Sequence, residues 1–94
     1  LELFGSGDAE AYRIVYQVNE RPTAPFTFLS GGSILDATAE LAVAAGKGWR
    51  EMVLTKACLP QLSNSLRIDS AGAFILQIDS ISREDLPDTT QCSF

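Results

Sequence analysis

The residue types that could carry catalysis or bind a metal are few in this chain. Its 94 residues include no histidine and only two cysteines, Cys58 and Cys92. The missing imidazole removes the Ser-His-Asp and Cys-His catalytic sets and every zinc site that needs a histidine ligand. Two thiolates cannot form a four-cysteine zinc site within one chain. We therefore expect no metal, no cofactor and no enzymatic activity.

The run Ser30-Gly31-Gly32-Ser33 is the most motif-like feature, because it follows an apolar segment and precedes an expected helix. Two glycines at a helix N-terminus could present backbone N–H groups to an anion, with help from the helix dipole and the two serine hydroxyls. A tight turn followed by a helix cap needs the same residues. The run is therefore a candidate anion site, with a plain structural turn as the alternative.

Asp69 and Asp79 form the one acid–base grouping that the pattern suggests, because they are expected to face each other across a final hairpin. Each follows an isoleucine on the polar alternate of its strand. Exposure to solvent explains that placement, and solvated carboxylates make poor general acids. We expect no catalysis there.

A small basic cluster surrounds the chain's only tryptophan. It consists of Lys47, Trp49, Arg50 and Lys56. Tryptophan and arginine are enriched at the residues that dominate binding energy in protein interfaces. The cluster is therefore a candidate protein-binding patch, and the alternative is a tryptophan that anchors a helix end in the core.

The net charge is −5, and the charges are unevenly distributed. Carboxylates outnumber cations in residues 1–20 and 69–94, whereas cations outnumber carboxylates in residues 21–68. Acidic ends argue against nucleic-acid binding, which draws much of its affinity from phosphate neutralisation by lysine and arginine. The acidity indicates solubility, or alternatively a surface that mimics nucleic acid toward a basic protein.

Two strands are expected before the glycine pair. Residues 11–20 alternate, with Tyr12, Ile14, Tyr16 and Val18 on one face, as in a strand with one solvated side. Residues 21–25 contain two prolines and must be a connection. Residues 26–30 resume the alternation, so the two strands are expected to form a hairpin.

The glycine pair is expected to end the second strand and to begin the main helix. Ser33 is the expected N-cap, with Asp36 near the positive end of the dipole. An apolar stripe follows at helical spacing, and Gly46 is a suitable stop. The stripe residues are Ile34, Thr38, Leu41 and Ala45.

Three further strands are expected after the helix. Residues 49–59 favour a strand, although their composition also tolerates helix. Residues 66–70 and 73–81 are expected to pair across Gly72. The sequence therefore predicts an α+β fold of one domain, a mostly antiparallel sheet in the order β-β-α-β-β-β with one main helix packed on one face. Apolar residues on the uncovered part of that sheet are expected to meet a partner.

The predicted organisation is an N-terminal arm (residues 1–10), a domain (11–82) and an acidic tail (83–94). We expect a small non-enzymatic binding module that acts through protein–protein contacts and self-associates. The alternatives are an acidic inhibitor that mimics nucleic acid, and a small-ligand or anion binder at Gly31-Gly32. No contact with nucleic acid or membrane is expected. Two cysteines without a dense framework favour free thiols and a cytoplasmic location.

Overall fold

Apolar residues at every second position form the strands that enclose the core. In strand β2 (Ala11–Val18), the side chains of Tyr12, Ile14, Tyr16 and Val18 are buried. The intervening residues are only half-buried, as expected for a strand that packs on one face. The predicted alternation in this segment is therefore confirmed.

The computed structural model describes residues 2–4, 11–63, 65–72, 75–86 and 90–93.

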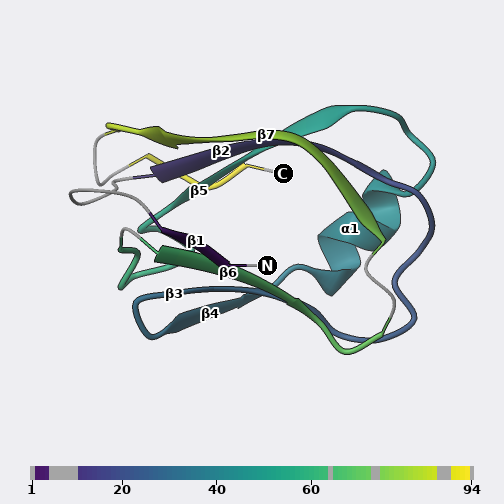
Figure 1. The fold of residues 1–94 in the computed structure, drawn as a ribbon, viewed down its shortest axis with the longest axis horizontal. Helices are drawn as coiled ribbons and strands as arrows, with labels where there is room; N and C mark the ends of the chain where they lie inside the picture. The colour runs from purple at the N-terminus through teal and green to yellow at the C-terminus, as the bar shows by residue number, and fades with distance from the viewer. Residues whose placement is uncertain (1, 5–10, 64, 73–74, 87–89, 94) are drawn as a thin grey trace.

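The strands form two antiparallel sheets that pack face to face (Figure 1). The first sheet has the order β1 (Glu2–Phe4), β6 (Ser65–Ser70), β3 (Phe26–Ser30) and β4 (Ser33–Asp36). The second has the order β5 (Arg50–Thr55), β2 and β7 (Leu76–Glu84). The core lies between them, with buried side chains from both sheets. The predicted α+β domain with antiparallel strands and one helix is confirmed, but two sheets replace the single one expected.

The helix α1 (Thr38–Ala44) covers one open end of this sandwich, which we call the helix end (Figure 1). Leu41 and Ala44 point into the core, so the predicted stripe is confirmed at Leu41. The opposite end carries the Gly31-Gly32 turn between β3 and β4, and we call it the hairpin end.

The predicted helix start at Ser33 is wrong. Residues 33–36 form strand β4, which pairs with β3 across a two-residue turn. Gly31 has φ 64° and Gly32 has φ 149°, conformations that glycine adopts easily and that suit a tight hairpin. Ser33 consequently cannot cap a helix. Ile34, expected on the buried stripe, is 66% exposed.

Strands that are neighbours in the sequence mostly lie in different sheets. β2 pairs with β5 and β7, and β3 pairs with β4 and β6, so the predicted hairpin of residues 11–20 with 26–30 does not form. The predicted pairing of residues 66–70 with 73–81 is also wrong, since β6 and β7 belong to opposite sheets. Residues 73 and 74 lie outside the described residues. The physical reason is that each sheet buries its apolar face on the other, which one short helix could not provide.

The sequence predicted a partner because one helix cannot cover a whole sheet. The second sheet covers that apolar face, so this reason no longer applies. Ile75 is buried, and Ile81 packs against the core cluster. Val15 and Leu29 lie half-buried on the outer faces of the two sheets. A partner must therefore be argued from particular exposed residues and not from an uncovered sheet.

Cys58 and Cys92 form a disulfide with Cα atoms 6.1 Å apart, so the prediction of free thiols is wrong. The cysteines are 34 residues apart in sequence, and folding brings the chain after β7 back beside β5.

Two strands bear on the predicted arm and tail: β7 continues to Glu84, and β1, which lies in the predicted arm, pairs with β6. The division into arm, domain and tail stays a prediction.

In the described part of the chain, no helix is both long enough and apolar enough to span a bilayer.

Candidate functional site

The predicted anion site lies beside an open hollow of about 510 Å³ on the outside of the first sheet. The register places Ile34 opposite Leu29 and Leu29 opposite Arg67, so these three side chains form a row across three strands. The Nε–H of Arg67 donates to Asp69 at 2.8 Å. The hollow thus combines two apolar side chains with an already paired cation. It is lined by Leu29, Ser30, Gly31, Gly32, Ser33, Ile34, Ser63, Ser65 and Arg67.

The serine hydroxyls of the predicted anion site hold a neighbouring loop. The Ser30 hydroxyl donates to the Ser65 carbonyl at 2.6 Å and accepts the Ser63 N–H at 2.9 Å. The Ser33 hydroxyl accepts the Gln61 N–H at 2.6 Å. Both serines are buried, and α1 begins only at Thr38. No helix dipole therefore acts at Gly31-Gly32, and the hydroxyls of Ser30 and Ser33 already take part in hydrogen bonds within the chain. Both facts weaken the anion-site hypothesis.

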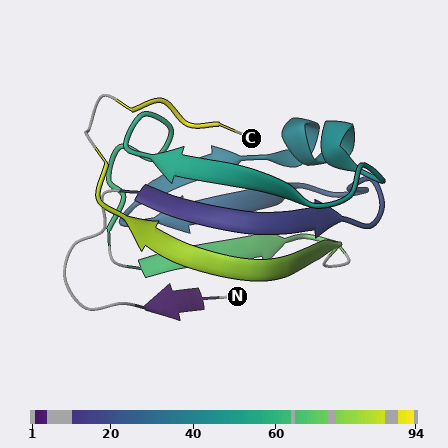
Figure 2. The same ribbon diagram turned by 90° about the horizontal axis from the view of Figure 1, so that it is seen from above.

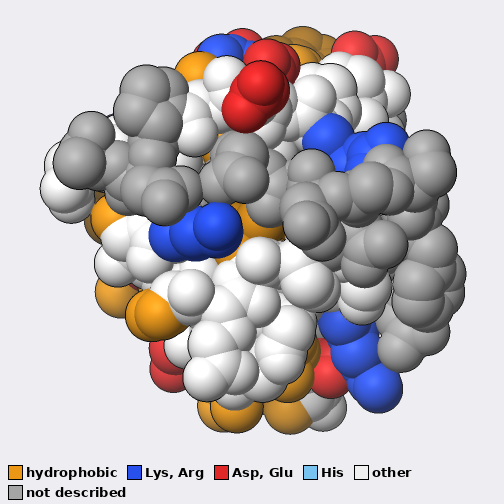
Figure 3. All heavy atoms as spheres, turned by 90° about the vertical axis from the view of Figure 1, so that its left-hand side faces the viewer, with side chains coloured by type: hydrophobic (Ala, Val, Ile, Leu, Met, Phe, Trp, Pro, Cys, Tyr) orange, Lys and Arg blue, Asp and Glu red, His pale blue; other side chains and the backbone are white. Residues whose placement is uncertain are grey.

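Polar groups predominate elsewhere at the hairpin end. The Tyr12 hydroxyl donates to the Ser63 carbonyl at 2.7 Å, and burial raises the pKa of this phenol. Figure 3 shows this face with lysine and arginine side chains at separate places and hydrophobic side chains only in small areas among the described residues. Among the described residues, no broad apolar surface is visible on this face (Figure 3).

The helix end carries two large exposed hydrophobic side chains. Val43 on α1 is 63% exposed and Trp49, just before β5, is 52% exposed. Gly46 and Gly48, with φ of 74° and 80°, flank the exposed Lys47 in the turn that joins the two elements. We call Val43, Lys47 and Trp49 the helix-end surface. Trp49 is not a core anchor, so the structural alternative expected for it does not apply.

The four residues of the predicted basic patch do not come together. Arg50 lies opposite Tyr16, whose side chain is buried, so Arg50 belongs to the core-facing register of β5. Its Nε is buried and has no hydrogen-bond partner in the described part of the chain. Lys56 follows the other end of β5, about 20 Å away at the rise of a strand. Lys47 and Trp49 therefore remain as the exposed part of that patch.

The predicted carboxylate pair is also separated. Asp69 lies on the outside of β6, whereas Asp79 lies in β7 where the register with β2 shifts at a β-bulge. Among the described residues, no three histidine, cysteine or acidic side chains are grouped as a metal site would require.

Sequence reasoning missed a charged cluster on the outer face of the second sheet. Arg13 donates through Nε to Glu84 at 3.0 Å and also pairs with Glu51, so it links all three strands. These hydrogen bonds, the one to Glu84 foremost, raise the pKa of Arg13. The register Arg13↔Val53 and Arg13↔Ser82 brings the three groups together, and no local spacing in the sequence reveals it.

Comparisons of the chain with protein-family models, with curated proteins and with solved structures found no match.

Proposed function

We propose that this chain is a small non-enzymatic binding module that contacts a protein partner through the helix-end surface, and that a second copy of the chain is one such partner. The observation that carries the proposal is the exposure of Trp49, 52% of whose surface meets solvent. Tryptophan is among the residues that most often dominate interface energies.

The surroundings of Trp49 support this choice. Val43 is a second exposed apolar side chain and Lys47 an exposed cation, and both lie within six residues of Trp49 in the sequence. Protein interfaces combine an apolar centre with a polar rim, and these residue types can supply both. At the hairpin end, in contrast, the exposed Ile34 lies beside polar groups that hold the loop together.

The alternative of an acidic nucleic-acid mimic has less support from the described charges. Glu51 and Glu84 are both paired with Arg13, and Asp69 is paired with Arg67. A mimic needs unneutralised carboxylates gathered on one face. The proposal therefore involves a protein partner, with no nucleic acid and no membrane.

The test uses self-association and the fluorescence of the single tryptophan. We expect the mass from sedimentation to rise above 10.1 kDa with concentration, and the Trp49 emission to shift to shorter wavelength in parallel. Trp49→Ala should weaken association about 5- to 30-fold, equivalent to about 1–2 kcal/mol. Ile34→Ala is the matched control, since it removes an equally exposed apolar side chain at the other end and should change nothing.

A chain that stays monomeric at every concentration would exclude the second copy as partner. A partner retained from a native extract would then have to be lost with Trp49→Ala, and binding that survives this change would overturn the proposal. Steep loss of binding with salt, together with insensitivity to Trp49→Ala, would favour the acidic mimic instead.

The expected cytoplasmic location rested on free thiols. Disulfides persist mainly in oxidising compartments, so the Cys58–Cys92 bond supports a function outside the reducing cytoplasm.

A further inference from the structure

The edge of β5 that faces away from β2 is covered by the chain's own C-terminal segment. The Val53 N–H donates to the Ser93 carbonyl at 2.8 Å, and the Ser93 N–H donates to the Val53 carbonyl at 3.0 Å. The Thr55 N–H points to the same edge and donates to Cys92 Sγ at 3.0 Å. Figure 2 shows the last segment running alongside β5. We call residues 90–93 the strap.

Burial along β5 shows the effect of the strap. Met52 and Leu54 point into the core and are fully buried. Val53 and Thr55 lie on the alternate positions, yet they are 9% and 1% exposed. On β2, the alternate residues are only half-buried. Val53 and Thr55 are also the two β5 residues that bond to the strap, so both alternates of β5 are buried where the strap lies against it.

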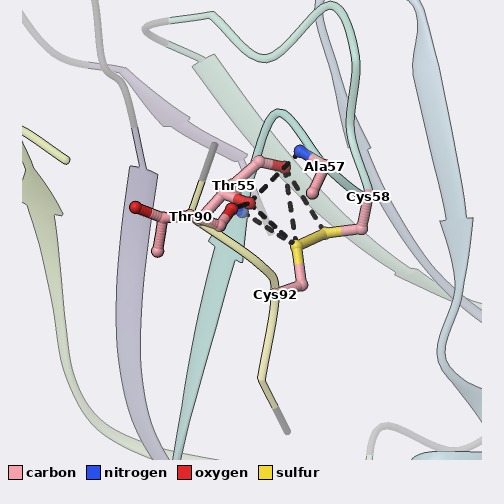
Figure 4. The surroundings of a disulfide bond; sticks show 5 residues. All are labelled: Thr55, Ala57, Cys58, Thr90 and Cys92. Carbon is pink, nitrogen blue, oxygen red and sulfur yellow. Dashed lines mark hydrogen bonds between the residues drawn. A yellow bond between two sulfur atoms is a disulfide. The ribbon is translucent and has the colours of Figure 1, made fainter. Parts of the chain in front are cut away.

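The strap is attached at one covalent point, next to Thr55 (Figure 4). Cys58 lies in the turn that follows β5, and Cys92 lies in the strap. The Thr55 hydroxyl donates to the Thr90 carbonyl at 2.6 Å and accepts the Ala57 N–H at 3.2 Å. Among the described residues, the strap is also bonded to β5 by the Thr55 N–H on Cys92 Sγ and by the bridge between Val53 and Ser93.

These few bonds roughly offset the entropy cost of ordering the strap, so little net free energy holds it beside β5 without the disulfide. Ordering each residue of a short segment costs backbone entropy of the same size as the net gain from one hydrogen bond. The cross-link reduces that cost, because it keeps Cys92 close to Cys58 even when the strap is not bonded to β5. Both cysteines are only partly buried, so a thiol reductant can reach the bond.

We propose that the Cys58–Cys92 disulfide is a redox-controlled latch: reduction releases the strap while the sandwich stays folded, and this frees the backbone N–H and C=O groups along the β5 edge. An unpaired edge presents a row of free N–H and C=O groups and is a template for strand addition. The surface is distinct from the helix-end surface and does not depend on the function proposed for it.

The chemical step is thiol–disulfide exchange with a dithiol. One thiolate of the reductant attacks a sulfur of the Cys58–Cys92 bond, and the other protein sulfur leaves as a thiolate that takes up a proton. The second thiol of the reductant then displaces the first protein sulfur. The protein gains two electrons and two protons as two thiols, and the reductant becomes a cyclic disulfide.

Amide hydrogen exchange of the full chain with and without dithiothreitol tests the release. The amides of Val53 and Thr55 should lose at least tenfold in protection on reduction of dilute protein. The amide of Ala37, which donates to the Phe26 carbonyl at 2.9 Å beneath the helix, should keep its protection and thus report that the sandwich is folded. Unchanged exchange at Val53, or loss of protection at Ala37 as well, would overturn the proposal.

The variant Cys92→Ser provides the open state without a reductant. It should show the same exchange pattern, and the Ala37 amide again serves as the folding control. If the Val53 amide of this variant is as protected from exchange as it is in the oxidised chain, the strap stays in place without the disulfide, and the proposal is wrong.

Discussion

The two ends of the sandwich are closed by different kinds of interaction. At the helix end, Leu41, Ala37 and Ala44 fill the opening with apolar side chains that are almost fully buried. At the hairpin end, the loop that follows β5 buries Leu59 and Leu62, and the hydroxyls of Ser30 and Ser33 hold it in place. A disulfide holds the strap at this end. The helix end thus relies mainly on burial, which has no direction, whereas the hairpin end adds bonds whose geometry must be met.

This difference separates stability from binding. At the helix end, the inner face is buried, whereas the side chains of Val43 and Trp49 are exposed and are not part of the core. The polar groups at the hairpin end are occupied in holding the chain together. We infer that a partner can be gained or lost at the helix end with little effect on folding, whereas changes at the hairpin end alter folding first.

The largest effect is expected from a charge placed inside the apolar end. Leu41→Asp should abolish the cooperative thermal transition, because burying an unpaired carboxylate costs several kcal/mol against a total stability of about 5–15 kcal/mol. Val43→Asp on the same helix is the matched control and should stay within about 0.5 kcal/mol of the parent, since Val43 is 63% exposed. A normal transition for Leu41→Asp would show that burial does not close this end.

A smaller effect is expected from crowding the turn at the polar end. At Gly31, with φ +64°, an added Cβ would lie 1.7 Å from the Gln61 carbonyl oxygen. Gly31→Ala should therefore cost about 2–5 kcal/mol from backbone strain and overlap together. Gly46→Ala has a similar φ, +74°, but meets nothing within 4 Å, and should cost only about 1–2 kcal/mol. Equal urea midpoints for the two variants would contradict the close approach.

The smallest effect concerns a hydrogen-bonded carboxylate that joins β4 to the helix. Thr38 donates to Asp36 through its hydroxyl and its N–H, at 2.5 and 2.9 Å, and these bonds lower the pKa of Asp36. A lowered pKa in the folded state means that the stabilisation is complete above the ordinary pKa of about 4 and is lost as the pH falls through the lowered value.

Asp36→Ala should thus lower the thermal midpoint slightly at pH 7, and the difference from the parent should vanish at acid pH. A difference for Asp36→Ala that is constant with pH would exclude the carboxylate as its source.

Periodic patterns in the sequence predicted the strands well where tertiary structure agrees with local preference. The alternation from Tyr12 to Val18 and the run Phe26–Ser30 lie in strands with the expected buried faces. The segment 33–36 misled because a serine after two glycines fits both a helix cap and the return strand of a hairpin. In the structure Gly31 adopts a positive φ, as the tight turn of a hairpin requires.

Pairing between distant strands could not be read from local patterns. Nothing in the spacing of Cys58 and Cys92 indicates that the chain returns to β5, and nothing near Arg13 indicates Glu84 as its partner. Residue type alone indicates Trp49 as a candidate binding residue. Its separation from Lys56 follows from the direction of β5, which residue type does not reveal.

The order of strands also sets how fast the chain can fold. Among the strand pairs of the described residues, only β3 and β4 are joined by a tight hairpin, whereas β2 pairs with β7 and β1 with β6 across most of the chain length. Closing such long loops costs entropy before any pairing compensates it. Sandwiches dominated by distant contacts fold on the order of milliseconds to seconds, far more slowly than helical proteins of the same size. During that interval the apolar faces of both sheets are unprotected, so this chain spends longer than a helical protein of equal length in states that can aggregate.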